Sequence, residues 1–436
     1  MFDGTTRFLT DEFPTMLAEA AIELLSSRST AISSPTLNAS TSSLMPKPKR
    51  PRLEAIDLLR GLLMVLMALD HTRDYFSNAV VDPADALHSW PALFATRWIT
   101  HLCASGFILV AGASIWLQRD RGKNRTQLSS FLVTRGLWLM LVELILITFA
   151  WQFSMKMLIL QVIWVLGASM IALAGLQWLP MPVVGIFGAF LVVGHNLLDS
   201  INAQTLGRWS DAWEILYQFG PLTFDDHTFA FVGYPLIPWI GVMALGYCFG
   251  ALLIIASQRR RRSSILIGSA MLATFTLLRL TGSYGDPNRW RHLATPTQTI
   301  MSFMQVEKYP PSLQYLLATL GILLLLYAVL DKAVEQNFQP RLRGFLKVYG
   351  RVPFFYYVLH IYLLHASALV GAAFLGLNWR FWTQPGSVFF GHLSGWGMSL
   401  PGVYAVWLTV VFSLYLPCRW FSRVKERRRD WWLSYL

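Results

Sequence analysis

The chain has 436 residues, of which 54% are hydrophobic and only 14% are charged, and 36 Lys and Arg against 24 Asp and Glu give a formal net charge of +12. Because soluble proteins carry roughly 25% charged residues, this composition excludes a soluble enzyme, a secreted disulfide scaffold and a nucleic-acid-binding protein, and it predicts a polytopic membrane protein. In such a protein the basic excess reflects cytoplasmic loops and needs no nucleic-acid partner.

The first 52 residues differ from the rest of the chain. They are dense in Ser and Thr between Ser26 and Ser43, and a segment of Pro, Lys and Arg follows at 46–52. This composition cannot bury a core, so residues 1–52 are predicted to form a disordered, basic N-terminal tail. Acidic residues occupy the place of a basic n-region, which argues against a signal peptide.

From Leu53 on, apolar runs recur at the length of about 17–25 residues that a helix needs to cross a bilayer. The runs are continuous rather than alternating, which favours helices, because a helix satisfies its own backbone polar groups in lipid. The predicted fold class is therefore all-α, a polytopic integral membrane helix bundle of about ten transmembrane helices. The expected spans are 55–75, 93–117, 131–151, 157–178, 181–199, 231–256, 264–282, 312–330, 353–375 and 402–421.

The distribution of Lys and Arg sets the expected orientation, because cytoplasmic loops carry the basic excess. Most Lys and Arg residues fall in cytoplasmic segments if both termini are cytoplasmic and the helix count is even. The expected domains are then the tail 1–52, a membrane domain 53–423 and a basic cytoplasmic tail 424–436. The opposite loops, 76–92, 200–230, 283–311 and 376–401, are long, and loops of this length are commonly functional. We expect them to roof a pocket on the outer face.

The first span holds the densest set of ionisable residues, among them Asp57, Arg60, Asp70 and His71. Each costs about 2.5–3.5 kcal/mol inside a membrane and therefore needs a reason. Asp57 and Arg60 are three residues apart and can pair. Arg60 and His71 share a helix face and lie about 16 Å apart along the axis. One face thus links a fixed cation inside to a titratable imidazole outside; the alternative is a structural ion pair and an interfacial histidine.

A second group surrounds the start of the second span. His88 precedes the helix, while Arg97 and His101 are four residues apart and face the same way. An imidazole beside a carboxylate or an amide suits general-base activation of an amine or a hydroxyl. The alternatives are that Arg97 snorkels to the interface and that His101 is a core histidine. His360 and His365 point away from each other, so we do not expect them to share a metal.

The stretch 52–71 resembles the opening of the transmembrane acyltransferase superfamily, which includes the type 3 acyltransferases and the heparan-alpha-glucosaminide N-acetyltransferases with their bacterial relatives. The element Ile56-Asp57-Leu58-Leu59-Arg60-Gly61 carries the resemblance. The segments 107–114, 234–243 and 350–360 are similar to further parts of the bacterial group, so the resemblance covers about 53–423. His71 matches the first-helix His of the type 3 enzymes. The lysosomal heparan-alpha-glucosaminide N-acetyltransferase has Asn at the position of His71, which argues against heparan as the acceptor. The catalytic His of that enzyme is best matched by His88.

The resemblance implies a membrane acyltransferase that moves an acyl group, in particular acetyl, from cytoplasmic acyl-CoA to a sugar amine or hydroxyl on the outer side. A histidine would act as general base or as transient acyl carrier. The catalytic candidates are His71, His88, Asp70 and His101. The candidates for the CoA site are Asp57, Arg60, Arg97 and Arg135. The guanidinium groups of the three arginines suit phosphates, and Asp57 can pair with Arg60.

The partners expected from this reading are acyl-CoA (acetyl-CoA) as co-substrate, a sugar or glycan acceptor and the lipid bilayer, without a metal or nucleic acid; a homodimer stays open. The expected location is a bacterial inner (plasma) membrane. A second hypothesis is a proton-coupled secondary transporter or exporter. A transporter should have related halves, and no convincing repeat joins 53–230 to 231–423. A third is a non-catalytic sensor or assembly subunit.

Overall fold

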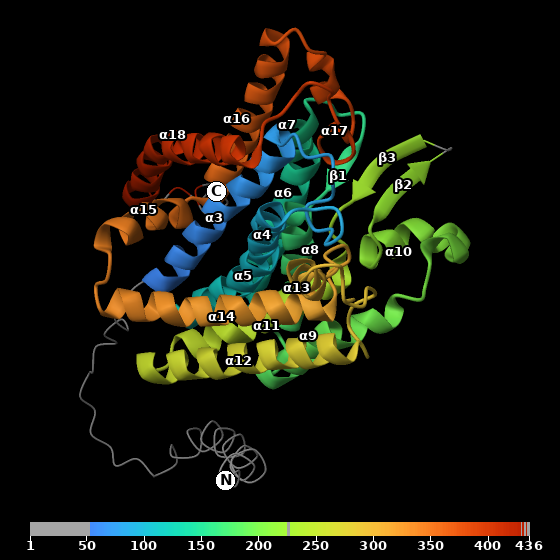
Figure 1. The fold of residues 1–436 in the computed structure, drawn as a ribbon. Helices are drawn as coiled ribbons and strands as arrows, with labels where there is room; N and C mark the ends of the chain where they lie inside the picture. Colours follow the sequence, from blue (N-terminus) through green and yellow to red (C-terminus); the bar gives the residue numbers. More distant parts are fainter. Residues whose placement is uncertain (1–52, 225–226, 429, 431–432, 434–436) are drawn as a thin grey trace, which may run out of the picture. The chain divides into compact units, whose positions relative to one another are not determined.

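The computed structural model describes residues 53–224, 227–428, 430 and 433, so the tail predicted for residues 1–52 lies outside the described residues. Most of the described chain is helical (Figure 1). Its α-helices are α3 (Glu54–Phe76), α4 (Pro91–Thr100), α5 (Leu102–Asp120), α6 (Arg125–Val142), α7 (Thr148–Gln152), α8 (Val162–Leu176), α9 (Met181–Gly194), α10 (Ser210–Leu216), α11 (Leu236–Leu253), α12 (Ser257–Thr281), α13 (Pro296–Met304), α14 (Leu313–Glu335), α15 (Pro340–Arg351), α16 (Pro353–Phe374), α17 (Ser387–Phe390) and α18 (Leu400–Arg427).

A helix occurs at each of the ten positions where the sequence predicts a span. Eight helical segments in the described part are long and apolar enough to cross a membrane: Pro91–Asp120, Arg125–Gln152, Met181–Leu198, Leu236–Leu253, Ser257–Thr281, Leu313–Glu335, Pro353–Phe374 and Leu400–Arg427. The other two are α3, which carries charged residues along its length, and α8, which has 15 residues. The chain is therefore an all-α, polytopic integral membrane bundle.

A small sheet was not predicted. Its strands are β1 (Leu158–Leu160), β2 (Gly220–Phe224) and β3 (His227–Val232), in the order β1-β3-β2. β3 pairs parallel with β1 and antiparallel with β2, and the β2–β3 hairpin lies next to α10 (Figure 1). The span expected from residue 157 therefore begins as a strand, and its helix starts only at Val162.

Glycines allow the helices to approach closely, as is common where no hydrophobic effect drives helices together in lipid. α3 crosses α15 at the tightest of these contacts. A Cβ at Gly61 would lie 2.0 Å from the carbonyl oxygen of Leu346, and one at Gly350 would lie 1.8 Å from that of Asp57. Further glycine pairs join α6 to α8 (Gly136 and Gly167), α9 to α11 (Gly188 and Gly241) and α12 to α14 (Gly268 and Gly321).

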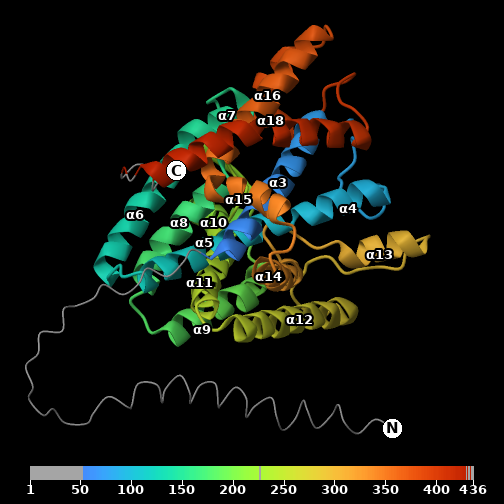
Figure 2. The same cartoon turned by 90° about the vertical axis from the view of Figure 1, so that its left-hand side faces the viewer.

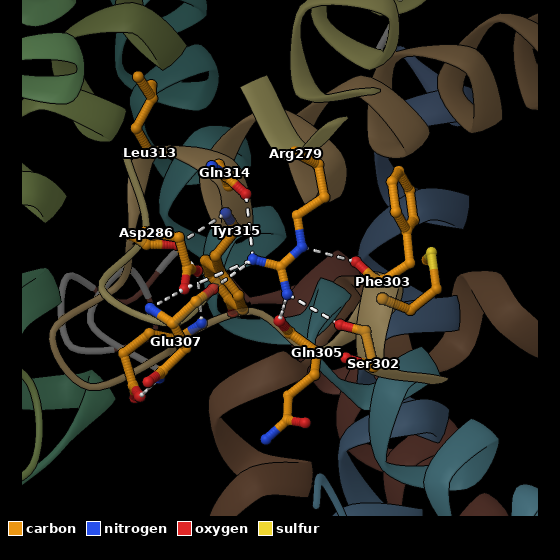
Figure 3. A network of polar contacts seen from close by, with 12 residues as sticks. Arg279, Asp286, Ser302, Phe303, Gln305, Glu307, Leu313, Gln314 and Tyr315 are labelled. Atoms are coloured by element: carbon orange, nitrogen blue, oxygen red, sulfur yellow. Dashed lines mark hydrogen bonds and ion pairs between the residues drawn. The ribbon is translucent and has the colours of Figure 1, made fainter. Parts of the chain in front are cut away.

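A buried arginine on α12 holds the loop between α12 and α14. Arg279 is 2% exposed, and its guanidinium donates to the backbone carbonyls of Asn288, Ser302, Phe303 and Gln305, as Figure 3 shows for the last three. It also lies 3.7 Å from a carboxylate oxygen of Asp286. The same loop contains α13, which lies beside α4 (Figure 2). One side chain thus fixes several turns of otherwise irregular backbone.

Candidate active site

One face of α3 joins two cavities. It carries Arg60, Met64, Met67 and His71, at spacings of four, three and four residues, which place the side chains in one row. The row is about 16 Å long at a rise of 1.5 Å per residue. Arg60, Met64 and Met67 line the first cavity, whereas His71 lines the second. The single face that the sequence predicts therefore runs from one cavity into the other.

The first cavity, here called the basic cavity, has a volume of about 360 Å³. Its basic lining consists of Arg60, Arg135, Arg351 and Lys425. Its remaining wall is mostly apolar and comes from Met64, Met67, Phe107, Ala111, Ser114, Ile115, Gln118, Phe131, Leu139, Val162, Ile163, Leu166, Met170, Pro353, Phe354, Tyr357 and Leu433. A cavity with an apolar wall and several cations suits a long ligand that is anionic at one end.

Arg60 is held in place by three helices. One terminal nitrogen donates to the carbonyl oxygen of Gly350 at 3.1 Å, and the other to the hydroxyl of Ser114 at 2.9 Å. The carboxylate of Asp57, one turn earlier, accepts at 3.3 Å. The motif found in the sequence thus has a physical role at each position: Asp57 orients Arg60, Arg60 faces the basic cavity, and Gly61 admits the backbone of α15.

The second cavity, here called the polar cavity, has a volume of about 280 Å³. It is lined by the charged residues Asp70, Arg73, Asp74, Asp82, Arg97 and Lys308, by the aromatic residues Trp151, Phe219, Phe231, Tyr234, Tyr309, Phe389 and Phe390, and by His71, Pro83, Ile159, Gln161, Gly233 and Val388. All four long loops that the sequence singles out contribute to this wall; that it faces outward stays a prediction. The sheet contributes through β1 and β3.

Asp70 is the centre of an ion-pair cluster between α3 and α4. Its carboxylate accepts from Arg97 at 2.8 and 2.9 Å and from the hydroxyl of Thr100 at 2.8 Å, and it lies 2.8 Å from Arg73. Both carboxylate oxygens are therefore engaged. Arg97, predicted to bind CoA, lies in the polar cavity with Asp70 and not beside Arg60 and Arg135, which share the basic cavity.

His71 is paired with a second histidine, His360, on α16. The Nδ1 of His71 lies 2.7 Å from the Nε2 of His360, and the Nδ1 of His360 lies 2.9 Å from the carbonyl oxygen of Tyr356. A carbonyl can only accept, so His360 carries its proton on Nδ1, and its Nε2 accepts from His71. The hydrogen-bond network thus assigns the proton of neutral His71 to Nδ1 and leaves a lone pair on its Nε2.

Two aromatic rings separate the cavities beside His71. The ring centroid of Trp151, which lines the polar cavity, lies 4.8 Å from that of His71. The centroid of Tyr357, which lines the basic cavity, lies 6.1 Å from that of His71. The indole nitrogen of Trp151 donates to the hydroxyl of Tyr357 at 3.4 Å. His71 therefore stands at the boundary between the two cavities.

The other two predicted histidines lie elsewhere. The side chain of His88 is 69% exposed, and its Nδ1 lies 2.5 Å from the carboxylate of Asp85. Although slight burial opposes it, hydrogen bonding with His88 and from the Leu87 amide lowers the pKa of Asp85. His101 is buried against Tyr315 and, within the described chain, its Nδ1 has no hydrogen-bond partner. Neither histidine is among the described residues that line the two cavities.

Four residues that matter here were not among the predicted site residues: His360, Trp151, Lys308 and Tyr309. His360 had one usable signal, because it lies inside the predicted span 353–375 and an ionisable residue within a membrane helix requires a partner. Lys308 and Tyr309 come from a loop and carry no pattern. Burial opposes the ionisation of Tyr309, but the positive charges of Lys308 and Arg97 hold the pKa of its phenol below the usual range.

As predicted, His360 and His365 diverge. His360 contacts His71, whereas His365 contacts the carbonyls of Ala150 and Trp382.

Comparison with known proteins bears on this geometry. A family model described as heparan-alpha-glucosaminide N-acetyltransferase, catalytic, matches residues 52–282. The match covers more than half of the chain, from the Asp57–Arg60 motif through α12, and includes His71, Asp70, Arg97 and Trp151. No curated protein is similar enough to match the chain.

Proposed function

The chain belongs to the catalytic family of the heparan-alpha-glucosaminide N-acetyltransferases and is thereby a membrane acyltransferase, and we propose that it transfers an acyl group, in particular acetyl, from acyl-CoA to an amine or hydroxyl of a sugar. The observation that carries this proposal is the row Arg60, Met64, Met67 and His71, which connects a basic cavity to a polar one. A proton-coupled transporter also uses intramembrane histidines, so the match to an acetyltransferase family is what favours transfer over transport.

The basic cavity is the proposed site for acyl-CoA. Arg60 and Arg135 would bind the phosphates of CoA, because planar guanidinium groups form paired hydrogen bonds with phosphate oxygens. The pantetheine arm would follow the apolar wall along Met64 and Met67, with the thioester next to His71. Asp57 supports this arrangement indirectly, by orienting Arg60.

The polar cavity is the proposed site for the acceptor. Its aromatic rings offer flat surfaces for the apolar faces of a sugar, and its charged groups offer partners for hydroxyl or amino groups. Lys308 is 7% exposed, and no described carboxylate lies within ion-pair distance of it. Its ammonium lies 5.0 Å from the ring centroid of Tyr309 and keeps further donors for an acceptor oxygen, whereas Arg73 and Arg97 are engaged with Asp70.

His71 is the proposed general base. Its Nε2 lone pair takes the proton of the acceptor as the acceptor nitrogen or oxygen attacks the thioester carbonyl. The new bond to carbon forms, the carbon–sulfur bond breaks, and the CoA thiolate takes the proton from the His71 imidazolium and leaves as the thiol. His360 keeps accepting from Nδ1 and thereby favours the imidazolium that forms. The same lone pair would also serve a transient acyl-His71, and exchange of labelled CoA into acetyl-CoA without any acceptor separates the two routes.

The proposed orientation places the basic cavity towards the cytoplasm and the polar cavity outside, with both termini cytoplasmic. Support comes from the basic segments near Arg60, including 119–125, 341–347 and 423–428, because such segments face the cytoplasm. Acyl-CoA is made in that compartment, so the reaction would carry an acyl group across the bilayer. The proposed location is a bacterial inner membrane, and the proposed boundaries of the membrane domain are 53 and 423.

The test is turnover by the purified full chain in nanodiscs, with acetyl-CoA, a panel of aminosugars and a thiol assay for released CoA. We expect His71→Ala to lower turnover by about 10²–10⁴-fold, the usual contribution of a positioned base. His88→Ala is the matched control and should retain activity, because His88 lies outside both cavities. Loss of activity in His88→Ala with retention in His71→Ala would move the base to the loop, and no binding of acetyl-CoA to the wild type would overturn the proposed function.

A further inference from the structure

Beside His71, two buried rings from different helices lie between the cavities. Trp151 on α7 is 1% exposed and Tyr357 on α16 is 2% exposed, and the two side chains are hydrogen-bonded to each other. Both lie against His71, one from the side of each cavity. An acyl group that reaches His71 from the basic cavity must therefore come to rest against these rings.

The rings have little freedom to move aside. The indole of Trp151 stacks on Tyr75 at a centroid distance of 5.8 Å and contacts Phe389 at 5.0 Å. The hydroxyl of Tyr75 also donates to the carbonyl oxygen of Trp151 at 3.0 Å. On the other side, the ring of Tyr357 lies 5.6 Å from that of His360. Protein interiors are close-packed, so additional methylene groups find no room between the two rings unless a ring is displaced.

We propose that Trp151 and Tyr357 set the length of the acyl group and restrict the enzyme to short acyl donors such as acetyl-CoA. This inference rests on the proposed function of the basic cavity as the donor site. Tyr357 touches the acyl group where it leaves the basic cavity, and Trp151 closes the space beyond the carbonyl. The two rings select the donor by volume and exchange no proton with it.

The experiment compares acetyl-, butyryl- and octanoyl-CoA as donors for the wild type and for Trp151→Leu, with kcat/KM taken from the release of free CoA. One methylene in an apolar pocket changes kcat/KM by roughly 10- to 200-fold. We therefore expect the ratio of butyryl to acetyl transfer to rise by at least about tenfold in the variant, because leucine leaves space where the indole was.

A matched pair at the second position separates volume from hydrogen bonding. Tyr357→Phe loses the hydroxyl that accepts from Trp151 but keeps the ring, so its donor preference should equal that of the wild type. Tyr357→Leu removes the ring and should broaden the preference as Trp151→Leu does. Melting curves identify folded variants, and either leucine variant suffices if the other fails to fold.

The outcomes distinguish this inference from the proposed function. Folded leucine variants that cleave acetyl-CoA with the wild-type chain-length ratio would overturn the inference and leave the acyltransferase proposal standing. A wild type that prefers butyryl- or octanoyl-CoA would also overturn it. A wild type that neither binds nor cleaves any acyl-CoA would overturn both.

Discussion

The pairing of His71 with His360 decides which nitrogen of His71 would act as the proposed base. A single backbone carbonyl, that of Tyr356, fixes the tautomer of His360, and His360 in turn fixes that of His71. The arrangement gives His360 a positioning role, because it holds the imidazole of His71 with Nε2 unprotonated. It resembles the way a carboxylate orients the histidine of a hydrolase triad, with a neutral acceptor in place of the charge.

Replacement of His360 tests that role at the residue scale. His360→Phe removes the acceptor and should lower kcat by about 10²-fold or more, because His71 is then free to adopt the unreactive tautomer. The KM for acyl-CoA should stay near the wild-type value, since His360 is not among the described residues of the basic cavity. Steady-state kinetics in nanodiscs give both constants.

The control is His360→Gln, whose amide oxygen can accept from His71. Partial recovery of kcat in this variant relative to His360→Phe is the expected result. Equal losses in both variants, with equally lowered melting temperatures, would show that His360 serves only the packing of α16.

At the scale of elements, the crossing of α3 and α15 positions Arg60. The two backbones touch at Gly61 and Gly350, and the carbonyl oxygen of Gly350 is also a partner of Arg60. The close approach and the orientation of the cation are therefore one structural feature. A side chain at either glycine would push α15 away and withdraw that carbonyl from Arg60.

Alanine substitutions at the crossing should reveal this. Gly61→Ala and Gly350→Ala would place a Cβ within 2.0 Å of a backbone oxygen, and overpacking of this kind costs about 1–3 kcal/mol or more. We expect lower melting temperatures and weaker acyl-CoA binding. Gly344→Ala, on α15 like Gly350, is the control, because a Cβ at Gly344 meets no atom within 4 Å and alanine favours a helix. Equal melting temperatures of all three variants would contradict the close backbone contact between α3 and α15.

Arg279 affects the polar cavity, because it holds the loop between α12 and α14 that carries Lys308 and Tyr309. Arg279→Met would leave several buried carbonyls without a donor, each at a cost of about 1–3 kcal/mol. The loop that carries Lys308 and Tyr309 should loosen, so transfer to the acceptor should fall while acyl-CoA binding persists. Binding by calorimetry and turnover by CoA release measure the two effects separately.

Thr274→Ala is the matched control on α12, because the hydroxyl of Thr274 bonds only to Ala270 of its own helix among the described residues. It should leave both quantities unchanged. A loss of acyl-CoA binding in Arg279→Met that equals its loss of transfer would argue that Arg279 stabilises the whole bundle and not one loop.

At the scale of the whole molecule, both proposed ligand sites are built on α3, so each ligand should stabilise the fold by mass action. A ligand at 100 times its dissociation constant contributes about 2.7 kcal/mol. We expect CoA to raise the melting temperature of the wild type and to do so much less in Arg60→Ala. Pantetheine, which lacks the nucleotide phosphates, should give little stabilisation. Equal shifts with CoA and pantetheine would contradict phosphate binding in the basic cavity.

The sequence predicted what depends on local pattern. Helices occur at all ten expected positions because length and apolar character decide them, and the row from Arg60 to His71 follows from helical spacing alone. The partner of His71 could not be predicted, because His360 is 289 residues away and the pair depends on how α16 crosses α3. The strands are too short to show alternation. Trp151 reaches the boundary through the π-helical segment Glu143–Ile147, which shifts the helix in a way that no regular spacing foresees.

The row on α3 also fixes both the distance and the relative direction of Arg60 and His71. Since successive residues of a helix are rotated by about 100°, one inserted or deleted residue between Arg60 and His71 would turn the imidazole out of the polar cavity while leaving the guanidinium in place. A full-turn insertion would restore the direction but lengthen the separation by about 5.4 Å. In the proposed function, the eleven residues from Arg60 to His71 set the distance between the donor's phosphates and its reactive carbon, and donors with shorter arms would bind without reacting.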